Sequence, residues 1–339
     1  MSGSGGTLTD SPLVSFVVLC YKTEQYVGDC IESILRIKTD VPFEIVALDD
    51  HSPDNTFGVL SSFTDPRLRV IRNDENMGHA RSIGVAFRAA RGKYVARIDS
   101  DDRYRPEFLD RTLPIFEKYP DVGMVYADAS LIGPTGIQTA PNSDTHHKGQ
   151  DFKGCELIEL LELNFICAPT IIARRDCFLR LLPVPEHLAF HDWYFTVGIS
   201  REMEFYYINS VLADYRVHPG NMHARTVLDK TEERSIFWFL DHVYSTPERL
   251  PELEARKMRG KKRIYGRHYV TYGDKYFGAS MNADARRCYI QALKWQPGFL
   301  RSPGFLRRLG ATLVGRSRYE KAKALARGLS ARSRAVKAA

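Results

Sequence analysis

About the first 120 residues alternate short apolar runs with segments whose apolar residues recur every three or four positions. Four of the runs predict buried strands, at residues 15–20, 43–50, 68–73 and 93–102. Between them, residues 27–35 and 78–90 place their apolar side chains on one helix face, as do Leu109, Leu113 and Phe116 farther along. This alternation predicts an open, doubly wound α/β sheet, which binds ligands where the carboxyl ends of its strands meet the loops.

The pattern changes after the apolar run at 122–132. Glycine and proline at 133–136 predict a hairpin, and residues 140–150 are typical of a mobile polar loop. From Thr226 onward only helical patterns remain. We therefore expect four parts: a flexible leader (1–12), an α/β domain (13–222), a helical region (226–298) and a basic helical tail (299–339).

The charge of the chain is unevenly distributed. The 339 residues have 48 Lys and Arg against 41 Asp and Glu, a formal net charge of +7. Residues 297–339 hold 11 basic side chains and one acid, so the rest of the chain is mildly acidic. No RNP-like, zinc-finger or helix-turn-helix pattern accompanies the basic tail, so a nucleic-acid partner is not expected.

The tail also has a narrow apolar stripe, made of Leu306, Leu309, Leu313 and Val314. We expect this stripe to pack onto the body of the protein. The alternative is peripheral attachment to an anionic membrane surface, since basic residues surround the stripe.

The cysteines and the lack of long apolar segments indicate the cellular compartment. None of the six cysteines is spaced as CxxC, and most stand among apolar neighbours, as buried thiols in a reducing compartment do. The first 12 residues lack the apolar core of a signal peptide. No stretch of about 18 uncharged apolar residues is present either, so we expect a cytoplasmic protein, peripheral on the inner membrane face if the tail binds lipid.

Acidic residues follow two of the predicted strands. Asp49 and Asp50 end the second strand, and Asp99, Asp101 and Asp102 end the fourth. Turn and helix-cap roles would explain one such group, because Asp is common there. Two groups at equivalent strand ends favour ligand binding, and Mg²⁺ or Mn²⁺ bridging a diphosphate suits such carboxylates.

Three segments, in this order, resemble the family 2 inverting glycosyltransferases with a GT-A fold. They are SFVVLCYKTEQYVGDCIESIL (15–35), EIVALDDHSPDNT (44–56) and NMGHARSIGVAFRAARGKYVARIDSDD (76–102). The resemblance extends over about residues 13–220. It implies a GT-A, Rossmann-like fold, with a mixed but mostly parallel sheet flanked by helices, followed here by an all-helical C-terminal region. It also implies a nucleotide-sugar donor and Mn²⁺ or Mg²⁺ as cofactor.

The resemblance implies roles for individual residues. Asp101, the second acid of the DxD pattern, would bind the metal, joined by His218 of the segment DYRVHPGN (214–221). Asp192 in FHDWYF (190–195) aligns with the family's catalytic base, preceded by His191 where the family usually has an acid. A helix N-cap is the alternative for Asp192. The implied nucleotide and donor contacts are Cys20, Tyr21, Glu24, Asp50, Gly78, Arg81, Asp99, Ser100 and Arg216.

The implied reaction is a single displacement in which the base takes a proton from an acceptor hydroxyl and the anomeric configuration inverts. The donor base could be uracil, guanine or thymine, with uracil the commonest in the family, and the acceptor a glycan or a lipid-linked sugar of cell-surface polysaccharide assembly. Two alternatives remain: a sugar-1-phosphate nucleotidyltransferase and a non-catalytic nucleotide-sugar-binding protein. The first usually has a glycine-rich loop after the first strand, and CYKTE contains no glycine.

Overall fold

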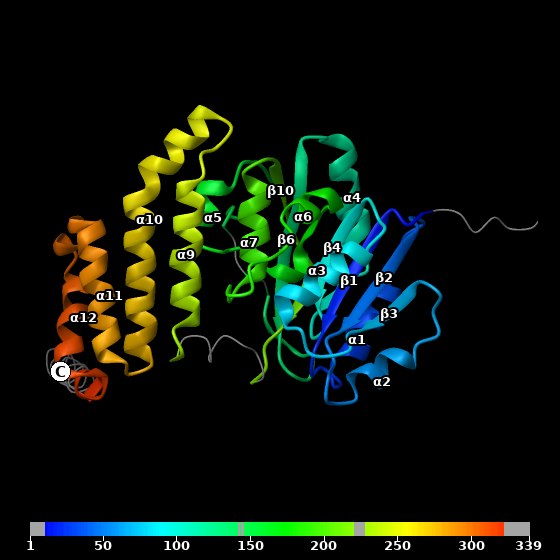
Figure 1. Cartoon of the computed structure of the whole chain (residues 1–339), viewed down its shortest axis with the longest axis horizontal. Helices are drawn as coiled ribbons and strands as arrows, with labels where there is room; N and C mark the ends of the chain where they lie inside the picture. Colours follow the sequence, from blue (N-terminus) through cyan, green and yellow to red (C-terminus); the bar gives the residue numbers. More distant parts are fainter. Residues whose placement is uncertain (1–10, 142, 144–145, 220–227, 322–339) are drawn as a thin grey trace, which may run out of the picture. The chain divides into compact units, whose positions relative to one another are not determined.

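The computed structural model describes residues 11–321 apart from 142, 144–145 and 220–227 (Figure 1). The chain forms two compact units, residues 1–221 and 222–339. The sequence boundary expected at 222–226 lies among residues that the structure does not describe. Within the described part, no helix is both long enough and apolar enough to cross a membrane.

A ten-stranded sheet is the centre of the first unit (Figure 1). The main path of strands runs in the order β3-β2-β1-β4-β9-β6-β10-β5, with β7 added to β6 and β8 to β10. The strands are β1 (Val14–Cys20), β2 (Phe43–Asp49), β3 (Leu68–Arg72), β4 (Tyr94–Asp99), β5 (Arg103–Tyr104), β6 (Val122–Ile132), β7 (Gln138–Ala140), β8 (Phe152–Gly154), β9 (Ile172–Arg174) and β10 (Glu204–Arg216).

The four longest ladders of the sheet are parallel. They join β1 to β2, β1 to β4, β2 to β3 and β6 to β10, whereas β9 joins β4 and β6 through short antiparallel ladders. The predicted hairpin is present, because β7 returns along β6 and the Gly133 N–H donates to the Ile137 carbonyl. In register, Cys20 lies opposite Asp49 and Leu19 opposite Asp99. The carboxyl ends of β1, β2 and β4 therefore meet at one edge.

Helices cover both faces of this sheet. The helical elements of the first unit are α1 (Val27–Leu35), α2 (Thr56–Ser61), α3 (His79–Ala89), α4 (Phe108–Lys118), α5 (Leu157–Glu162), the 3₁₀ turn η1 (Ala168–Thr170), α6 (Arg175–Arg180) and α7 (His191–Ser200). Alternate residues of β1, such as Phe16, pack in one core with α1, α2 and α4. On α3, α6 and α7, the rings of Phe87, Phe178 and Phe195 pack against one another.

The described part of the second unit is helical, as the sequence pattern predicts. Its elements are α9 (Thr231–Ser245), α10 (Pro251–Gly278), α11 (Asn282–Trp295), the 3₁₀ turn η2 (Pro297–Arg301) and α12 (Pro303–Val314), and Figure 1 shows the four helices side by side. The tyrosines of α10 give this unit its core, since Tyr265, Tyr272 and Tyr276 are buried.

The expected packing of the tail stripe is wrong. On α12 the buried residues are Phe305, Ala311 and Thr312, and Phe305 packs against Tyr289 of α11. Of the stripe, Leu306, Leu313 and Val314 are exposed, Leu313 by 70%. The helix therefore turns a different face to its neighbours, because the Phe305 ring offers more apolar area than any leucine of the stripe.

Candidate active site

Asp50, directly after β2, holds the loop that follows β3 through its carboxylate. One of its oxygens accepts from Asn73 Nδ2 (2.7 Å) and the Met77 N–H (2.9 Å), and the other accepts from the Gly78 N–H (2.9 Å). Gly78 has φ +79°, a conformation that favours glycine. A carboxylate has about four lone-pair sites, so these three contacts leave room for one further donor. That is compatible with the predicted contact to a ring N–H of the base.

Asp99 ends β4 beside a buried arginine. Arg97, two residues earlier on the same face of the strand, pairs with the Asp99 carboxylate and lies 3.3 Å from His79 Nε2. Burial raises the pKa of Asp99, but Arg97, His79 and His191 outweigh this effect and lower it to about 2. Asp99 is therefore a permanent anion whose charge is already balanced by protein cations and dipoles.

Asp101 and Asp102 have the opposite character. Burial together with the charge of Asp99 raises the pKa of Asp101, and burial with the charges of Asp101 and Asp99 raises that of Asp102 well above its ordinary value. Within the described part of the chain, one buried oxygen of Asp102, Oδ2, has no hydrogen-bond partner. These carboxylates repel each other and favour a cation between them.

His218 reaches this acidic turn from the end of β10. Its Nε2 lies 3.0 Å from Asp101 Oδ2, and its ring packs against Tyr26 with centroids 4.8 Å apart. The two residues predicted to bind the metal are thus brought together across 117 positions of sequence. Imidazole nitrogen and carboxylate oxygen suit Mn²⁺, and the buried, unpartnered oxygen of Asp102 adds to the fit, so the residues present accommodate such an ion.

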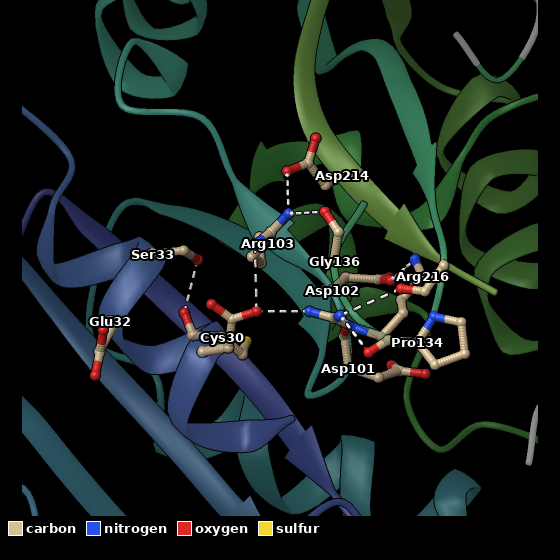
Figure 2. Close-up of polar contacts among 12 residues, drawn as sticks. Cys30, Glu32, Ser33, Asp101, Asp102, Arg103, Pro134, Gly136, Asp214 and Arg216 are labelled. Atoms are coloured by element: carbon tan, nitrogen blue, oxygen red, sulfur yellow. Dashed lines mark hydrogen bonds and ion pairs between the residues drawn. The ribbon is translucent and has the colours of Figure 1, made fainter. Parts of the chain in front are cut away.

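Arg216 anchors the acidic turn to the rest of the sheet (Figure 2). Its backbone N–H donates to Asp102 Oδ1 (2.7 Å), and its guanidinium donates to the Asp101 carbonyl (2.7 Å), to Pro134 and to Asp29 Oδ2 (2.6 Å). The side chain is 3% exposed. A contact with a diphosphate, which the resemblance implies, would require one of these acceptors to be exchanged, so the structure gives Arg216 a positioning role.

Asp192 lies in the first turn of α7. The N-cap residue of this helix is Phe190 and makes no side-chain capping bond, so the alternative that Asp192 is the N-cap is wrong. Among the described contacts, its carboxylate accepts one hydrogen bond, from Asn164 Nδ2 (3.1 Å). Its charge also stabilises the Arg97 guanidinium, raising the pKa of that group. Asp192 thus lies near the acids at the β4 end with lone pairs available.

His191, which stands where the family usually has an acid, stacks on His79 of α3. The ring centroids are 4.6 Å apart. Burial, with His79 and Arg97 beside it, lowers the pKa of His191 to about 3, so this imidazole is neutral at physiological pH. The substitution therefore removes a negative charge from the neighbourhood of Asp99.

The remaining predicted donor contacts lie in two places. The hydroxyls of Ser100 and Thr23 hydrogen bond at 2.8 Å, and Glu24 Oε2 accepts from the Asn55 N–H (2.8 Å). Cys20 is buried at the end of β1, and burial raises the pKa of its thiol, which stays protonated. Tyr21 follows it and is 42% exposed. Cys20, Tyr21 and Glu24 thus lie at or after the end of β1, and Ser100 lies after the end of β4.

Arg81 differs from the other predicted donor contacts because it lies on the surface and pairs with an acid outside the acidic turn. It is exposed on α3 and pairs with Glu186 (2.6 Å), 105 residues later. Exposed pairs of this kind contribute little stability and exchange readily. The structure does not bring this guanidinium into contact with the acids of the β4 end.

Three residues of this site were not found from the sequence: Asp29, Arg103 and Arg97. Asp29 binds Arg216 and Arg103. Arg103 also binds Asp214 (3.1 Å), as Figure 2 shows. Arg97 did carry a signal, since a charged residue inside an apolar strand requires a partner, and Asp99 stands on the same face. Asp29 carried none, because an acid on an exposed helix turn is ordinary.

Comparisons with known proteins agree with this architecture. Residues 15–180 match the family described as Glycosyl transferase family 2. TuaG of Bacillus subtilis, a glycosyltransferase assigned to teichuronic acid biosynthesis, is 27% identical over 72% of this chain and 92% of its own length. The succinoglycan biosynthesis protein ExoO of Rhizobium meliloti is 38% identical, but over only 30% of this chain. The chain spans about a third of the length of ExoO and of a Haemophilus influenzae glycosyltransferase.

Among solved structures, residues 1–349 of Staphylococcus aureus TarS, in complex with UDP-GlcNAc, are similar in fold. The TM-score is 0.66 at 16% identity, with 92% of each chain covered. The mixed sheet, its flanking helices and the helical C-terminal region confirm the expected GT-A class of fold. Residues 15–180, within the first unit, are thus similar in sequence to glycosyltransferase family 2.

Proposed function

We propose that this protein is an inverting glycosyltransferase that moves a sugar from a nucleoside diphosphate donor to a hydroxyl acceptor in polysaccharide assembly. The observation that carries the proposal is the cluster of Asp101, Asp102 and His218 at the carboxyl edge of the sheet, with Asp192 nearby on α7. The names of TuaG and ExoO, which refer to polysaccharide biosynthesis, support the setting.

A UDP-sugar is the donor that we propose. TarS, similar in fold, was solved with UDP-GlcNAc and with UDP. In this chain, Asp50 has room for one more donor and lies on the loop expected to meet the base. A mannosyltransferase of Pyrobaculum calidifontis with a TM-score of 0.57 was solved with GDP-mannose instead, so donors with guanine belong in the same test.

Asp101 and His218 would hold Mn²⁺ or Mg²⁺, with Asp102 next to them. The Pyrobaculum enzyme was solved with Mn²⁺, which supports this choice of ion. When bound, such an ion neutralises negative charge on the leaving diphosphate. The protein's own contribution is to fix the acidic turn, which Arg216 does through the Asp101 carbonyl and the Asp102 carboxylate.

Asp192 would act as the general base. Asn164 orients its carboxylate and leaves lone pairs for the proton of an acceptor hydroxyl. Removal of that proton as the oxygen attacks the anomeric carbon gives a product of inverted configuration and no covalent enzyme intermediate. The acceptor is a hydroxyl of a glycan or of a lipid-linked sugar.

A screen of nucleotide sugars tests the proposal directly. UDP-, GDP- and dTDP-sugars are incubated with the full chain, first with EDTA and then with Mn²⁺ or Mg²⁺, and nucleoside diphosphate release is measured. We expect release from one donor class, dependent on the metal, and an inverted anomeric proton signal in the product. Pyrophosphate formation from a sugar 1-phosphate and a nucleoside triphosphate would instead identify a nucleotidyltransferase.

Attachment to an anionic membrane surface through the tail completes the proposal. The exposed side chains of Leu306, Leu313 and Val314 on α12, next to the basic residues of the tail, support it. Vesicles with and without anionic lipid are sedimented with the wild type and with a Leu306→Ser/Leu313→Ser variant. We expect only the anionic vesicles to retain the protein, and to retain less of the variant; equal retention everywhere would contradict attachment.

A further inference from the structure

Two adjacent histidines that take no part in the proposed reaction have fixed rings. His146 and His147 lie in the segment between β7 and β8. The His146 ring stacks on Phe165 with centroids 4.0 Å apart, and the His147 ring stacks on Phe152 at 4.3 Å. The two imidazoles are nearly perpendicular, at 87°. Stacking of this kind restricts the two rings before any ligand binds and still permits small rotations.

A buried carboxylate faces these rings. Glu156, immediately before α5, has a side chain that is 1% exposed. Its Oε1 accepts from Tyr126 Oη (2.8 Å) and lies 2.7 Å from His147 Nε2. One potential ligand atom from each of His146, His147 and Glu156 lies within 4.8 Å of the other two. Small side-chain rotations would bring three such atoms to a common ion.

The charges around this cluster favour a cation. Glu159, one turn along α5, adds a second negative charge near the buried Glu156 carboxylate. Within the described part of the chain, no Lys or Arg forms an ion pair with Glu156. The carboxylate is thus buried without a full positive charge beside it, which is costly.

We propose that His146, His147 and Glu156 form a second metal site, selective for a Zn²⁺-type ion and separate from the acidic turn at Asp101. Two imidazole nitrogens and one carboxylate oxygen are the donor set that Zn²⁺ accepts, with water in the fourth position. Binding would displace a proton from His147 or Glu156 and leave Tyr126 as a hydrogen-bond donor to the bound carboxylate. His146 is exposed, so the ion reaches the site from solvent.

The site would connect a loop to the segment that orients the proposed base. Phe165, against which His146 stacks, follows Asn164, which donates to Asp192. An ion bound by His146 would therefore restrict the motion of both the loop and this segment. The inference concerns a site of its own and does not depend on the identity of the donor or the acceptor.

Calorimetric titration of the tag-free, metal-stripped full chain with ZnCl₂, in saturating Mg²⁺, tests this proposal. We expect one equivalent to bind with a Kd of about 1 μM or tighter. His146→Ala, whose exposed position makes misfolding improbable as an explanation, and Glu156→Gln should each weaken binding by about tenfold or more. Asp101→Asn and the matched control His242→Ala, an exposed histidine of the second unit, should bind as the wild type does.

Two further measurements identify the ligands. Co²⁺ bound at this site should show tetrahedral visible absorption without a thiolate charge-transfer band, which excludes the cysteines. Zn²⁺ should also slow amide hydrogen exchange in residues 146–154 of the wild type but not of His146→Ala. The proposal is overturned if no stoichiometric binding occurs, if His146→Ala binds normally, or if Asp101→Asn alone abolishes binding. In that case, the hydrogen bonds of Tyr126 and His147 to Glu156 are the whole function of the cluster.

Discussion

The two units of the protein bury acidic side chains in different ways. In the first, Asp101 and Asp102 lie next to Asp99 and each other, and their pKa values are raised by burial and mutual repulsion. In the second, Glu233 is paired with Arg287 (2.7 Å) and Tyr276 (2.6 Å). Glu233 is thus compensated by an arginine, whereas Asp101 and Asp102 lie beside further acids.

The buried lysine of the second unit shows the same compensation. Lys257 on α10 is fully buried and binds Glu248 (2.7 Å), Glu254 (2.9 Å) and the Thr246 carbonyl (2.6 Å). A buried charge with complete partners stabilises a particular packing. A buried cluster of like charges reduces stability and is retained where it binds something. Buried charges with partners therefore characterise the scaffold, and buried like charges that lie together characterise the candidate site.

The strongest test of this contrast is Asp101→Asn. Removal of a proposed metal ligand should lower kcat/KM by about 10³-fold or more, because metal neutralisation of the leaving group provides several kcal/mol. The Tm should stay equal or rise, since repulsion with Asp102 is relieved. Steady-state kinetics and thermal unfolding measure the two effects, with Asp110→Asn, an exposed acid on α4, as control. A fall in Tm with unchanged kinetics would assign Asp101 to the scaffold.

The substitution Asp192→Asn should have the second-largest effect on activity. The variant keeps the shape of the side chain and loses the proton acceptor, so kcat should fall by about 10²–10⁴-fold while donor affinity stays near that of the wild type. Single-turnover kinetics and donor titration separate the two quantities. Asp176→Asn, an exposed acid on α6, should change neither. Loss of donor binding in Asp192→Asn would exclude the base role.

Lys257→Met probes the compensated charges of the second unit. The substitution removes the buried contacts of the ammonium with Glu248, Glu254 and the Thr246 carbonyl, so the free energy of unfolding should fall by about 3–5 kcal/mol, with little change in kcat of the folded fraction. Chemical denaturation measures this free energy. The control is Lys262→Met, which replaces an exposed lysine of α10. Adding Glu248→Gln should recover part of the loss. A decrease below about 1 kcal/mol would show that the contacts of Lys257 contribute little to stability.

The smallest effect concerns pH. Burial raises the pKa of Glu233, but hydrogen bonds from Arg287 and Tyr276 outweigh burial and lower it below the ordinary value of 4.5. Its contribution to stability is therefore complete above pH 4.5 and is lost as the pH falls through the lower folded-state pKa. The free energy of unfolding, measured between pH 6 and pH 3, should decline less steeply with falling pH in Glu233→Gln than in the wild type. A matched Glu252→Gln variant should follow the wild type.

Much of the fold could be predicted from local patterns. The alternation of apolar runs and helical stripes located β1 to β4 together with α1 and α3, because strand and helix periods are properties of neighbouring residues. The short helix α2 was not predicted. The gathering of Asp50 and Asp99 at one edge also followed, since parallel strands end on the same side. The stripe on α12 was misjudged because two faces of that helix are apolar and only its neighbours select one.

The sequence by itself thus determined the parallel strands β1 to β4, the acidic strand ends and the resemblance to family 2 glycosyltransferases. Only the tertiary structure decided which charges meet. Arg216 binds Asp29 across 187 positions, and Arg81 pairs with Glu186 across 105 positions. His146 and His147, which looked like part of a polar loop, converge on a carboxylate buried beneath them. Such pairings depend on the three-dimensional path of the chain, which brings together groups that no local period relates.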